Sequence, residues 1–120
     1  MPLAPRVFAI ALLCASGSSA LAHAFLDHAV PAVGSTVHGA PTSIRVWFTQ
    51  DIEPAFSTIK LQDAKGVELA AADKAVDPSD RSLMQLPVPP LGPGTYRVKW
   101  RVLSIDSHVT EGDFTFNVAP

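Results

Sequence analysis

The feature that most constrains this chain is a strict alternation of apolar and polar side chains in residues 95–102. Successive side chains of a β-strand point to opposite faces, so the pattern predicts a strand with one buried and one solvated face. The apolar positions are Tyr96, Val98, Trp100 and Val102, and the positions between them are Arg97, Lys99 and Arg101. A chain built around this strand needs a second apolar layer to cover it.

Further short strands are predicted along the rest of the chain. Residues 43–49 alternate in the same way, and weaker runs occupy residues 24–30, 56–62, 67–69, 83–86 and 114–118. Turn residues separate these runs at intervals of about 8–12 residues, and no useful helical period is present. This spacing predicts an all-β sandwich or barrel of about seven strands. Residues 70–80 lack a pattern and are expected to form a long surface loop, and the prolines of 87–93 indicate an edge or a crossover.

The first 22 residues have the three-part pattern of a secretory signal peptide. Arg6 precedes the apolar run Val7–Ala15, and small residues follow, ending in Ala20-Leu21-Ala22. The run is too short to span a membrane, which takes about 20 apolar residues. Cleavage after Ala22 leaves a single domain, 23–120, that begins with His23. Cleavage after Ala24 is the alternative, and the chain would then begin at Phe25.

Composition excludes several classes of site from the mature chain. Cys14 lies inside the signal, so no disulfide or thiolate metal site remains. Loss of Arg6 leaves 9 − 1 = 8 basic against 11 acidic side chains, with no basic run interleaved with aromatics, so nucleic-acid binding has no electrostatic support. The chain has no nucleophile elbow, phosphate-binding loop or His-Glu-x-x-His motif, so we do not expect an enzyme.

Asp106 and His108 are candidate metal ligands. In an extended strand, residues two apart project to the same side, so a carboxylate and an imidazole would point together. Continuing the parity of residues 95–102 would bury this pair and expose Leu103 and Ile105, which is unfavourable. We therefore expect a bulge or bend near Leu103 or Ser104 that brings the pair to the surface. The alternative is that Asp106 and His108 are ordinary turn residues.

His23 is a third candidate ligand if cleavage makes it the first residue. Its α-amine and ring Nδ1 then form a chelate, and with Asp106 and His108 they supply three nitrogens and one oxygen. Such tetragonal donors suit copper(II). Met84 is the only methionine left after cleavage, so soft ligands for copper(I) are scarce. His28 is expected on an exposed strand face and His38 in a loop; whether either forms a weak second site stays open.

Several separated motifs, in order, resemble the CopC family of periplasmic copper-binding, copper-resistance proteins. The resemblance covers essentially the whole mature chain and is most specific from residue 98 to residue 116. The motifs are His23-Ala-Phe-Leu26, Pro31-Ala-Val-Gly-Ser35, Val46-Trp-Phe-Thr49, Asp63-Ala-Lys-Gly66, Leu91-Gly-Pro-Gly-Thr-Tyr96, Val98-Lys-Trp-Arg-Val102, Ser104-Ile-Asp-Ser-His108 and Gly112-Asp-Phe-Thr-Phe116.

The resemblance implies a small Greek-key β-barrel or sandwich, cupredoxin-like or immunoglobulin-like, that binds copper(II) at its mature N-terminus. The family's N-terminal histidine corresponds to His23, and its Asp-x-His pair to Asp106 and His108. The implied function is that of a monomeric periplasmic carrier or buffer in copper homeostasis or resistance. An inner-membrane copper transporter of the CopD type is the expected partner.

Three departures from the family pattern narrow this expectation. Family members often have glycine between the Asp and the His, where this chain has Ser107. A glutamate present in some members is replaced by Gln50, which is not carried over as a ligand. The methionine-rich loop of other members corresponds to residues 62–84, which hold one methionine. The chain therefore resembles the copper(II)-only type.

Two other functions are compatible with parts of the sequence. An N-terminal histidine with a second histidine also resembles the copper site of lytic polysaccharide monooxygenases. Asp106 as a fourth equatorial ligand would block oxygen chemistry there, and the short chain lacks a broad aromatic face. A structural or adhesion β-sandwich without metal is the third interpretation.

Overall fold

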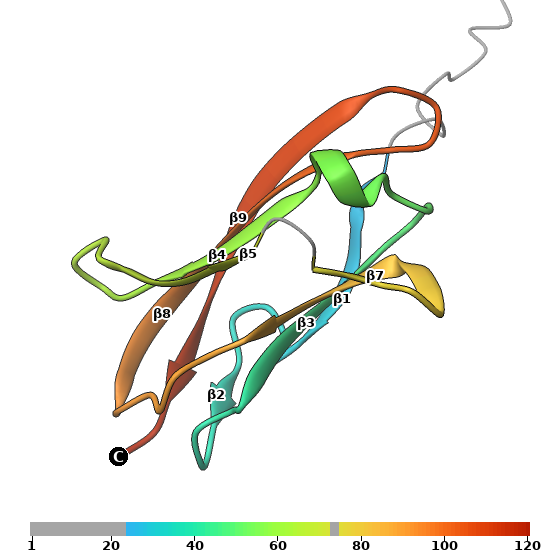
Figure 1. Cartoon of the computed structure of the whole chain (residues 1–120). Helices are drawn as coiled ribbons and strands as arrows, with labels where there is room; N and C mark the ends of the chain where they lie inside the picture. The colour runs from blue at the N-terminus through green and yellow to red at the C-terminus, as the bar shows by residue number, and fades with distance from the viewer. Residues whose placement is uncertain (1–23, 73–74) are drawn as a thin grey trace, which may run out of the picture.

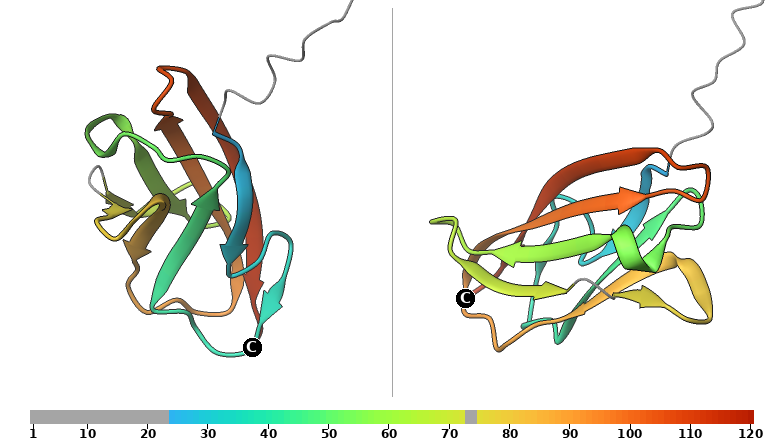
Figure 2. Two further views of the ribbon diagram at one scale, coloured as in Figure 1. Left: turned by 90° about the vertical axis from the view of Figure 1, so that its right-hand side faces the viewer. Right: turned by 45° about the horizontal axis from the view of Figure 1, so that its top comes forward.

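The computed structural model describes residues 24–72 and 75–120, which form two facing β-sheets (Figures 1 and 2). One sheet has the order β1-β3-β7-β6 and the other β2-β9-β8-β4-β5; neighbours pair antiparallel except for the parallel pair β2–β9. The all-β sandwich expected from the sequence is confirmed. The strands are β1 (Leu26–Val30), β2 (Thr36–Val37), β3 (Ser43–Phe48), β4 (Thr58–Gln62), β5 (Glu68–Ala72), β6 (Val76–Asp77), β7 (Asp80–Pro87), β8 (Gly94–Leu103) and β9 (Val109–Val118).

The core lies between the two sheets and is built from the alternating positions. On β8 the four predicted apolar side chains are all buried, while the basic residues between them are exposed on the outer face. The buried residues of the facing strands complete the layer: Ile44, Val46 and Phe48 of β3, Ile59 and Leu61 of β4, Met84 and Leu86 of β7, and Phe114, Phe116 and Val118 of β9. Alternation therefore predicted the inward face of the main strands correctly.

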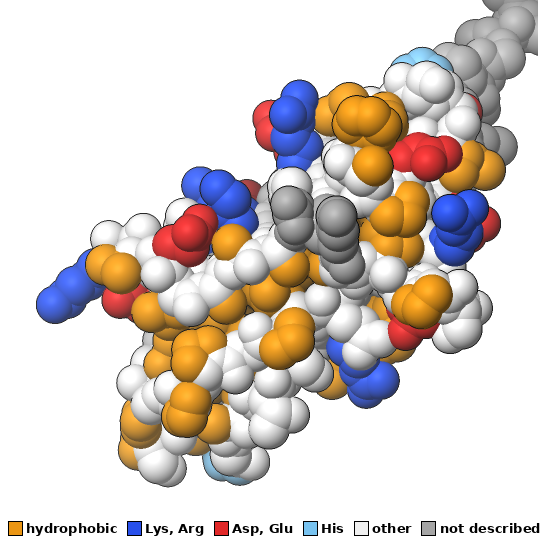
Figure 3. Space-filling view, viewed as in Figure 1, with side chains coloured by type: hydrophobic (Ala, Val, Ile, Leu, Met, Phe, Trp, Pro, Cys, Tyr) orange, Lys and Arg blue, Asp and Glu red, His pale blue; other side chains and the backbone are white. Residues whose placement is uncertain are grey.

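The outer face of the larger sheet carries charges of both signs. Lys60 Nζ on β4 lies 3.5 Å from Glu68 Oε1 on β5, and Arg101 Nε on β8 lies 4.0 Å from Glu111 Oε2 on β9. In Figure 3, basic and acidic side chains accordingly lie next to one another along the upper side of the molecule. Exposed ion pairs of this kind contribute little stability, about 0–1 kcal/mol each.

Several sequence-based boundaries were wrong. Strand β9 begins at Val109 and not at residue 114, and strand β2 was not predicted. Residues 70–80 are not one long loop, because β5 extends to Ala72, β6 follows, and Asp80 already begins β7. Strand β7 is longer than the predicted 83–86 and lies inside its sheet, between β3 and β6. Phe56 is exposed in a short 3₁₀ turn, η2 (Pro54–Phe56), and β4 begins only at Thr58. The prolines after β7 do mark a crossover, since the next strand, β8, belongs to the other sheet.

No bulge interrupts β8 at Leu103 or Ser104. The β8–β9 register is unbroken from Gly94↔Val118 to Leu103↔Val109, and the direction changes in the turn of residues 104–108. Ser104 keeps the inward parity of Val102 and is fully buried. The parity conflict is therefore resolved by a small polar residue at the inward position and a turn after it. No helix in the described part of the chain is long and apolar enough to cross a membrane.

Candidate metal centre

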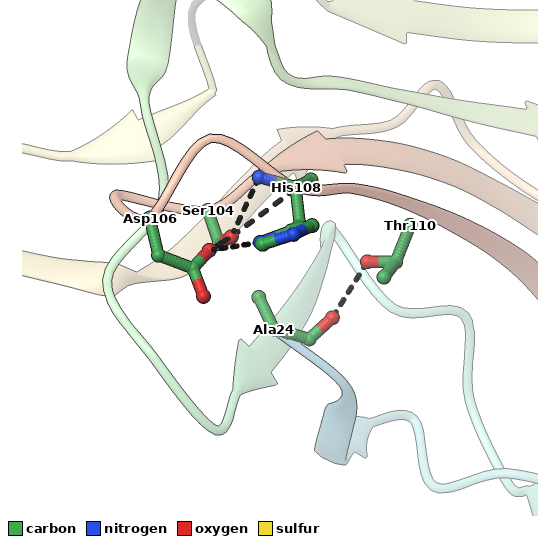
Figure 4. A network of polar contacts seen from close by, with 5 residues as sticks. All are labelled: Ala24, Ser104, Asp106, His108 and Thr110. Atoms are coloured by element: carbon green, nitrogen blue, oxygen red, sulfur yellow. Dashed lines mark hydrogen bonds and ion pairs between the residues drawn. The ribbon is translucent and has the colours of Figure 1, made fainter. Parts of the chain in front are cut away.

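The turn between β8 and β9 brings Asp106 and His108 into contact, as predicted. Asp106 Oδ1 lies 3.3 Å from His108 Nδ1 (Figure 4). The turn is closed by two backbone bonds: Ser104 N donates to His108 O at 2.9 Å, and Ser107 N donates to Ser104 O at 2.9 Å. Ser107, between the two candidate ligands, has a φ of +70°, the left-handed region in which glycine is most at ease. At this position the family pattern described above often has glycine.

The two oxygens of the Asp106 carboxylate have different surroundings. Oδ1 accepts a hydrogen bond from the Ser104 hydroxyl and faces the His108 ring. Oδ2 is buried, yet it has no hydrogen-bond partner among the described residues. A buried polar atom without a partner is uncommon in native proteins and calls for an explanation, such as an ion. The Asp106 side chain is 29% exposed and that of His108 is 52% exposed, so the pair remains accessible from solvent.

The hydrogen bonds around Asp106 keep its carboxylate ionised. The Ser104 hydroxyl, and after it the His108 imidazole, lower the pKa of Asp106 below its ordinary value, against the raising effect of partial burial. Both contacts favour the charged form, because each stabilises a negative oxygen. Asp106 therefore presents a negatively charged oxygen ligand beside an imidazole at neutral pH.

The beginning of the described chain is attached next to this turn. Ala24 is fully buried, and its carbonyl oxygen accepts a 2.6 Å hydrogen bond from Thr110 Oγ1, two residues after His108 (Figure 4). The next residue is tied to the other sheet: Phe25 N donates to Thr49 Oγ1 at 3.0 Å, and Thr49 N donates to Phe25 O at 2.8 Å. Residues 24 and 25 are thus held between β9 and the end of β3.

The third predicted ligand, His23, lies outside the described residues, as does the predicted signal segment 1–22. Within residues 24–72 and 75–120, no group of three or more His, Cys, Asp or Glu side chains is arranged to hold a metal ion. The described part thus supplies two neighbouring candidate ligands, a carboxylate and an imidazole.

The other two described histidines lie on the surface, as expected. His28 is exposed on β1, where its Nδ1 lies 2.7 Å from Asp27 Oδ2 and its ring stacks on Trp47 with a centroid distance of 4.3 Å. His38 is exposed in the loop after β2, which pairs with the far end of β9 from the turn.

Sequence reasoning missed two hydroxyl residues that organise the centre, Ser104 and Thr110. Ser104 continues the buried parity of β8, so a polar residue at an inward position was an available signal. Thr110 gave no signal, because its partner Ala24 is separated from it by 86 positions. Only the pairing of the sheets brings the two together.

Comparison with known proteins shows the family. The family model of the CopC domain matches residues 26–119. Copper resistance protein C of Xanthomonas campestris pv. juglandis is 37% identical, over 97% of this chain and 94% of its own length. The crystal structure of CopC from Methylosinus trichosporium OB3b has a TM-score of 0.73 and 34% identity, and covers 82% of this chain and 95% of that one. PcoC of Escherichia coli, described as a methionine-rich copper resistance protein, has a TM-score of 0.69 and 34% identity over 81% of this chain and 99% of its own. With this match across nearly all of the described residues, the chain belongs to the CopC family.

Proposed function

We propose that this protein is a periplasmic copper(II) carrier or buffer, in which Asp106, His108 and an N-terminal His23 hold one ion. The observation that carries the proposal is the buried, unpartnered Oδ2 of Asp106 beside the His108 imidazole. A copper ion bound to that oxygen would supply the missing partner. Carboxylate and imidazole donors with an amine suit a tetragonal copper(II) site.

The contact between Asp106 and His108 also supports the ligand assignment. If His108 Nδ1 carries the ring proton, it donates to Asp106 Oδ1, and Nε2 then has the lone pair that a metal needs. A carboxylate that orients a histidine through its second nitrogen is a common arrangement in metal sites. In this protein the same carboxylate would orient the imidazole through Oδ1 and bind the ion through Oδ2.

Removal of residues 1–22 is part of the proposal, because it frees the amine of His23. His23 is bonded directly to Ala24, which Thr110 holds two residues from His108. Consecutive Cα atoms are about 3.8 Å apart across a trans peptide, so this attachment limits how far His23 lies from the turn. Export would then complete the site by exposing a two-nitrogen chelate.

The described part of the chain offers no exposed thioether or thiolate ligand for copper(I). Met84, the one methionine of the proposed mature chain, is fully buried in the core and points between the sheets. Thioether and thiolate ligands select copper(I), whereas nitrogen and oxygen ligands suit the oxidised ion. We therefore propose that reduction weakens binding and releases the ion to a partner, for which an inner-membrane transporter of the CopD type is the candidate.

Titration of the mature chain with copper(II) tests this function. The chain 23–120 is checked by intact mass, and its affinity is measured by competition with a copper(II) chelator. We expect one ion per chain, and a loss of more than tenfold in both Asp106→Asn and His108→Ala, since even outer partners of a metal are worth about 10–100-fold. His38→Ala is the matched control and should bind as the parent does. Unchanged binding in both ligand variants, or an equal loss in the control, contradicts the proposal.

A further inference from the structure

We infer that Ser104 is a positioning residue of the copper(II) site, whose hydroxyl directs Oδ2 of Asp106 toward the ion and holds His108 in place. The inference rests on the proposed function and extends it to a residue that contacts no metal. Its basis is the set of hydrogen bonds that one fully buried hydroxyl makes to both members of the ligand pair.

Ser104 is itself fixed on several sides. It is fully buried, and it forms an antiparallel bridge with Ile52, which is buried as well. Its backbone N–H donates to His108 O, and its backbone oxygen accepts from Ser107 N. A side chain held in this way loses little entropy when it orders a neighbour, which is what a supporting residue of a metal site requires.

The hydroxyl of Ser104 connects the two candidate ligands. It donates to Asp106 Oδ1, and its oxygen accepts from His108 N at 3.4 Å; His108 O lies 3.1 Å away as the second possible acceptor of its proton. A hydroxyl has one proton, and the ionised carboxylate is the stronger acceptor of the two. We therefore infer that the Ser104 hydroxyl donates its hydrogen bond to Asp106 Oδ1, which stays ionised. The backbone N–H of His108 then donates to the Ser104 oxygen.

The two carboxylate oxygens of Asp106 therefore have different roles. Oδ1 faces two donors, the Ser104 hydroxyl and the His108 ring, and cannot turn toward a metal without losing both. Oδ2 remains for the ion, so the carboxylate binds through one oxygen. Without the hydroxyl, the carboxylate is free to rotate or to swing into solvent.

The fold supplies a matched control in Ser57, the other fully buried polar residue among those described. Its hydroxyl donates to Glu53 O at 2.8 Å and accepts from Leu103 N at 3.2 Å. Ser57→Ala therefore also deletes a buried hydroxyl with two hydrogen bonds, next to the same end of β8, but it leaves the contacts of Asp106 and His108 intact.

The experiment compares Ser104→Ala and Ser57→Ala in the chain 23–120. We expect Ser104→Ala to lower copper(II) affinity about 10–100-fold and to change the electron paramagnetic resonance spectrum of the one-copper complex, while Ser57→Ala changes affinity less than threefold. Ser104→Cys keeps the size of the buried side chain but donates a weaker hydrogen bond, so its copper(II) affinity should also fall below that of the parent.

Several results would overturn the inference. Equal losses of affinity in the two serine variants would mean that Ser104 acts only through general stability. Copper(II) affinity of Ser104→Cys equal to that of the parent would mean that the hydroxyl bond does not position the carboxylate; this variant keeps the test decisive if Ser104→Ala does not fold. The proposed function fails separately, if Asp106→Asn and His108→Ala both bind like the parent. The inference alone fails if these two lose binding and Ser104→Ala does not.

Discussion

Replacing Gly112 with alanine tests the packing that supports the end of the sandwich near the metal centre. Gly112 on β9 is the register partner of Trp100 on β8. A Cβ added at Gly112 would lie 2.6 Å from Cζ2 and 3.0 Å from Cε2 of the Trp100 indole. Carbon atoms pack best at about 3.5–4.0 Å, so the ring would have to move by roughly 1 Å. It has little room, because Trp100 is only 9% exposed and packs edge-on against Phe48 with a centroid distance of 5.1 Å.

Two opposed effects set the magnitude. Alanine in place of glycine restricts the unfolded chain and stabilises by about 0.4–1 kcal/mol where it fits. Overpacking a rigid, buried ring costs about 1–3 kcal/mol. The clash is the larger effect, so we expect Gly112→Ala to lower the free energy of unfolding by about 1–2 kcal/mol. For a domain of this size each kcal/mol corresponds to about 4–8 °C in Tm, so the melting temperature should fall by roughly 5–15 °C.

The assay is urea and thermal unfolding of the copper-free chain 23–120, followed by tryptophan fluorescence. Gly92→Ala is the control, because a Cβ at Gly92 meets nothing within 4 Å. The control should be neutral or slightly stabilising. A Gly112→Ala variant as stable as the parent, or one whose Tm changes no more than that of the control, would refute the argument that Trp100 requires a residue without a side chain opposite it.

Further outcomes are expected from two substitutions near the site and from a change in pH. Thr110→Val removes the hydroxyl that donates to the buried Ala24, so thermal unfolding should show a loss of about 1–3 kcal/mol, and an unchanged Tm would count against this attachment. Ser107→Gly removes the strain of a left-handed φ at that turn residue, which should stabilise the folded state by about 1–2 kcal/mol. The greater freedom of glycine in the unfolded chain costs roughly 0.5–1 kcal/mol. Urea unfolding should therefore show a free energy of unfolding higher by about 0.5 kcal/mol, and a clear decrease would contradict this reasoning. The pKa of Asp106 is lower in the folded protein than in the unfolded chain, where it is roughly 4. The ionised Asp106 therefore stabilises the fold above that unfolded pKa, and this stabilisation is lost as the pH falls through the lower pKa of the folded state. Copper(II) affinity should nevertheless fall from pH 7 to pH 5, because protons compete for the nitrogen ligands; Asp106→Asn should bind more weakly with the same pH slope, and loss of that slope would contradict the assignment.

The sequence was most informative where side-chain period alone decides the structure. Strands β3 and β8 each bury one face against the core, so their alternation predicted which residues point inward. Strand β7 was predicted too short because its first residues, Asp80, Arg81 and Ser82, are polar and show no apolar alternation. The alanines of residues 70–80 carry little hydrophobic pattern, so the sequence predicts a loop there; in the structure, backbone pairing places Ala70–Ala72 beside β4 and Val76 and Asp77 beside β7.

The candidate site was predictable only in part. The Asp-x-His spacing and the family resemblance both pointed to Asp106 and His108, and the structure places them in contact. Of the predicted bulge or bend, the structure has the bend: the chain turns directly after Ser104, while the β8–β9 register has no bulge. Ser104 itself tolerates burial because its hydroxyl finds partners within its own turn. The contact between Thr110 and Ala24 depends on the packing of strands distant in sequence, which no local pattern encodes.

The central claim is that copper(II) binds to His108, Asp106 and a free N-terminal His23. Electron paramagnetic resonance of the one-copper complex tests it most directly, with the chain beginning at His23 compared with one that keeps a single extra residue before it. For the first chain we expect a tetragonal spectrum with three nitrogens and one oxygen. For the second chain we expect loss of the amine nitrogen and an affinity lower by orders of magnitude. The same spectrum and affinity from both chains would contradict it.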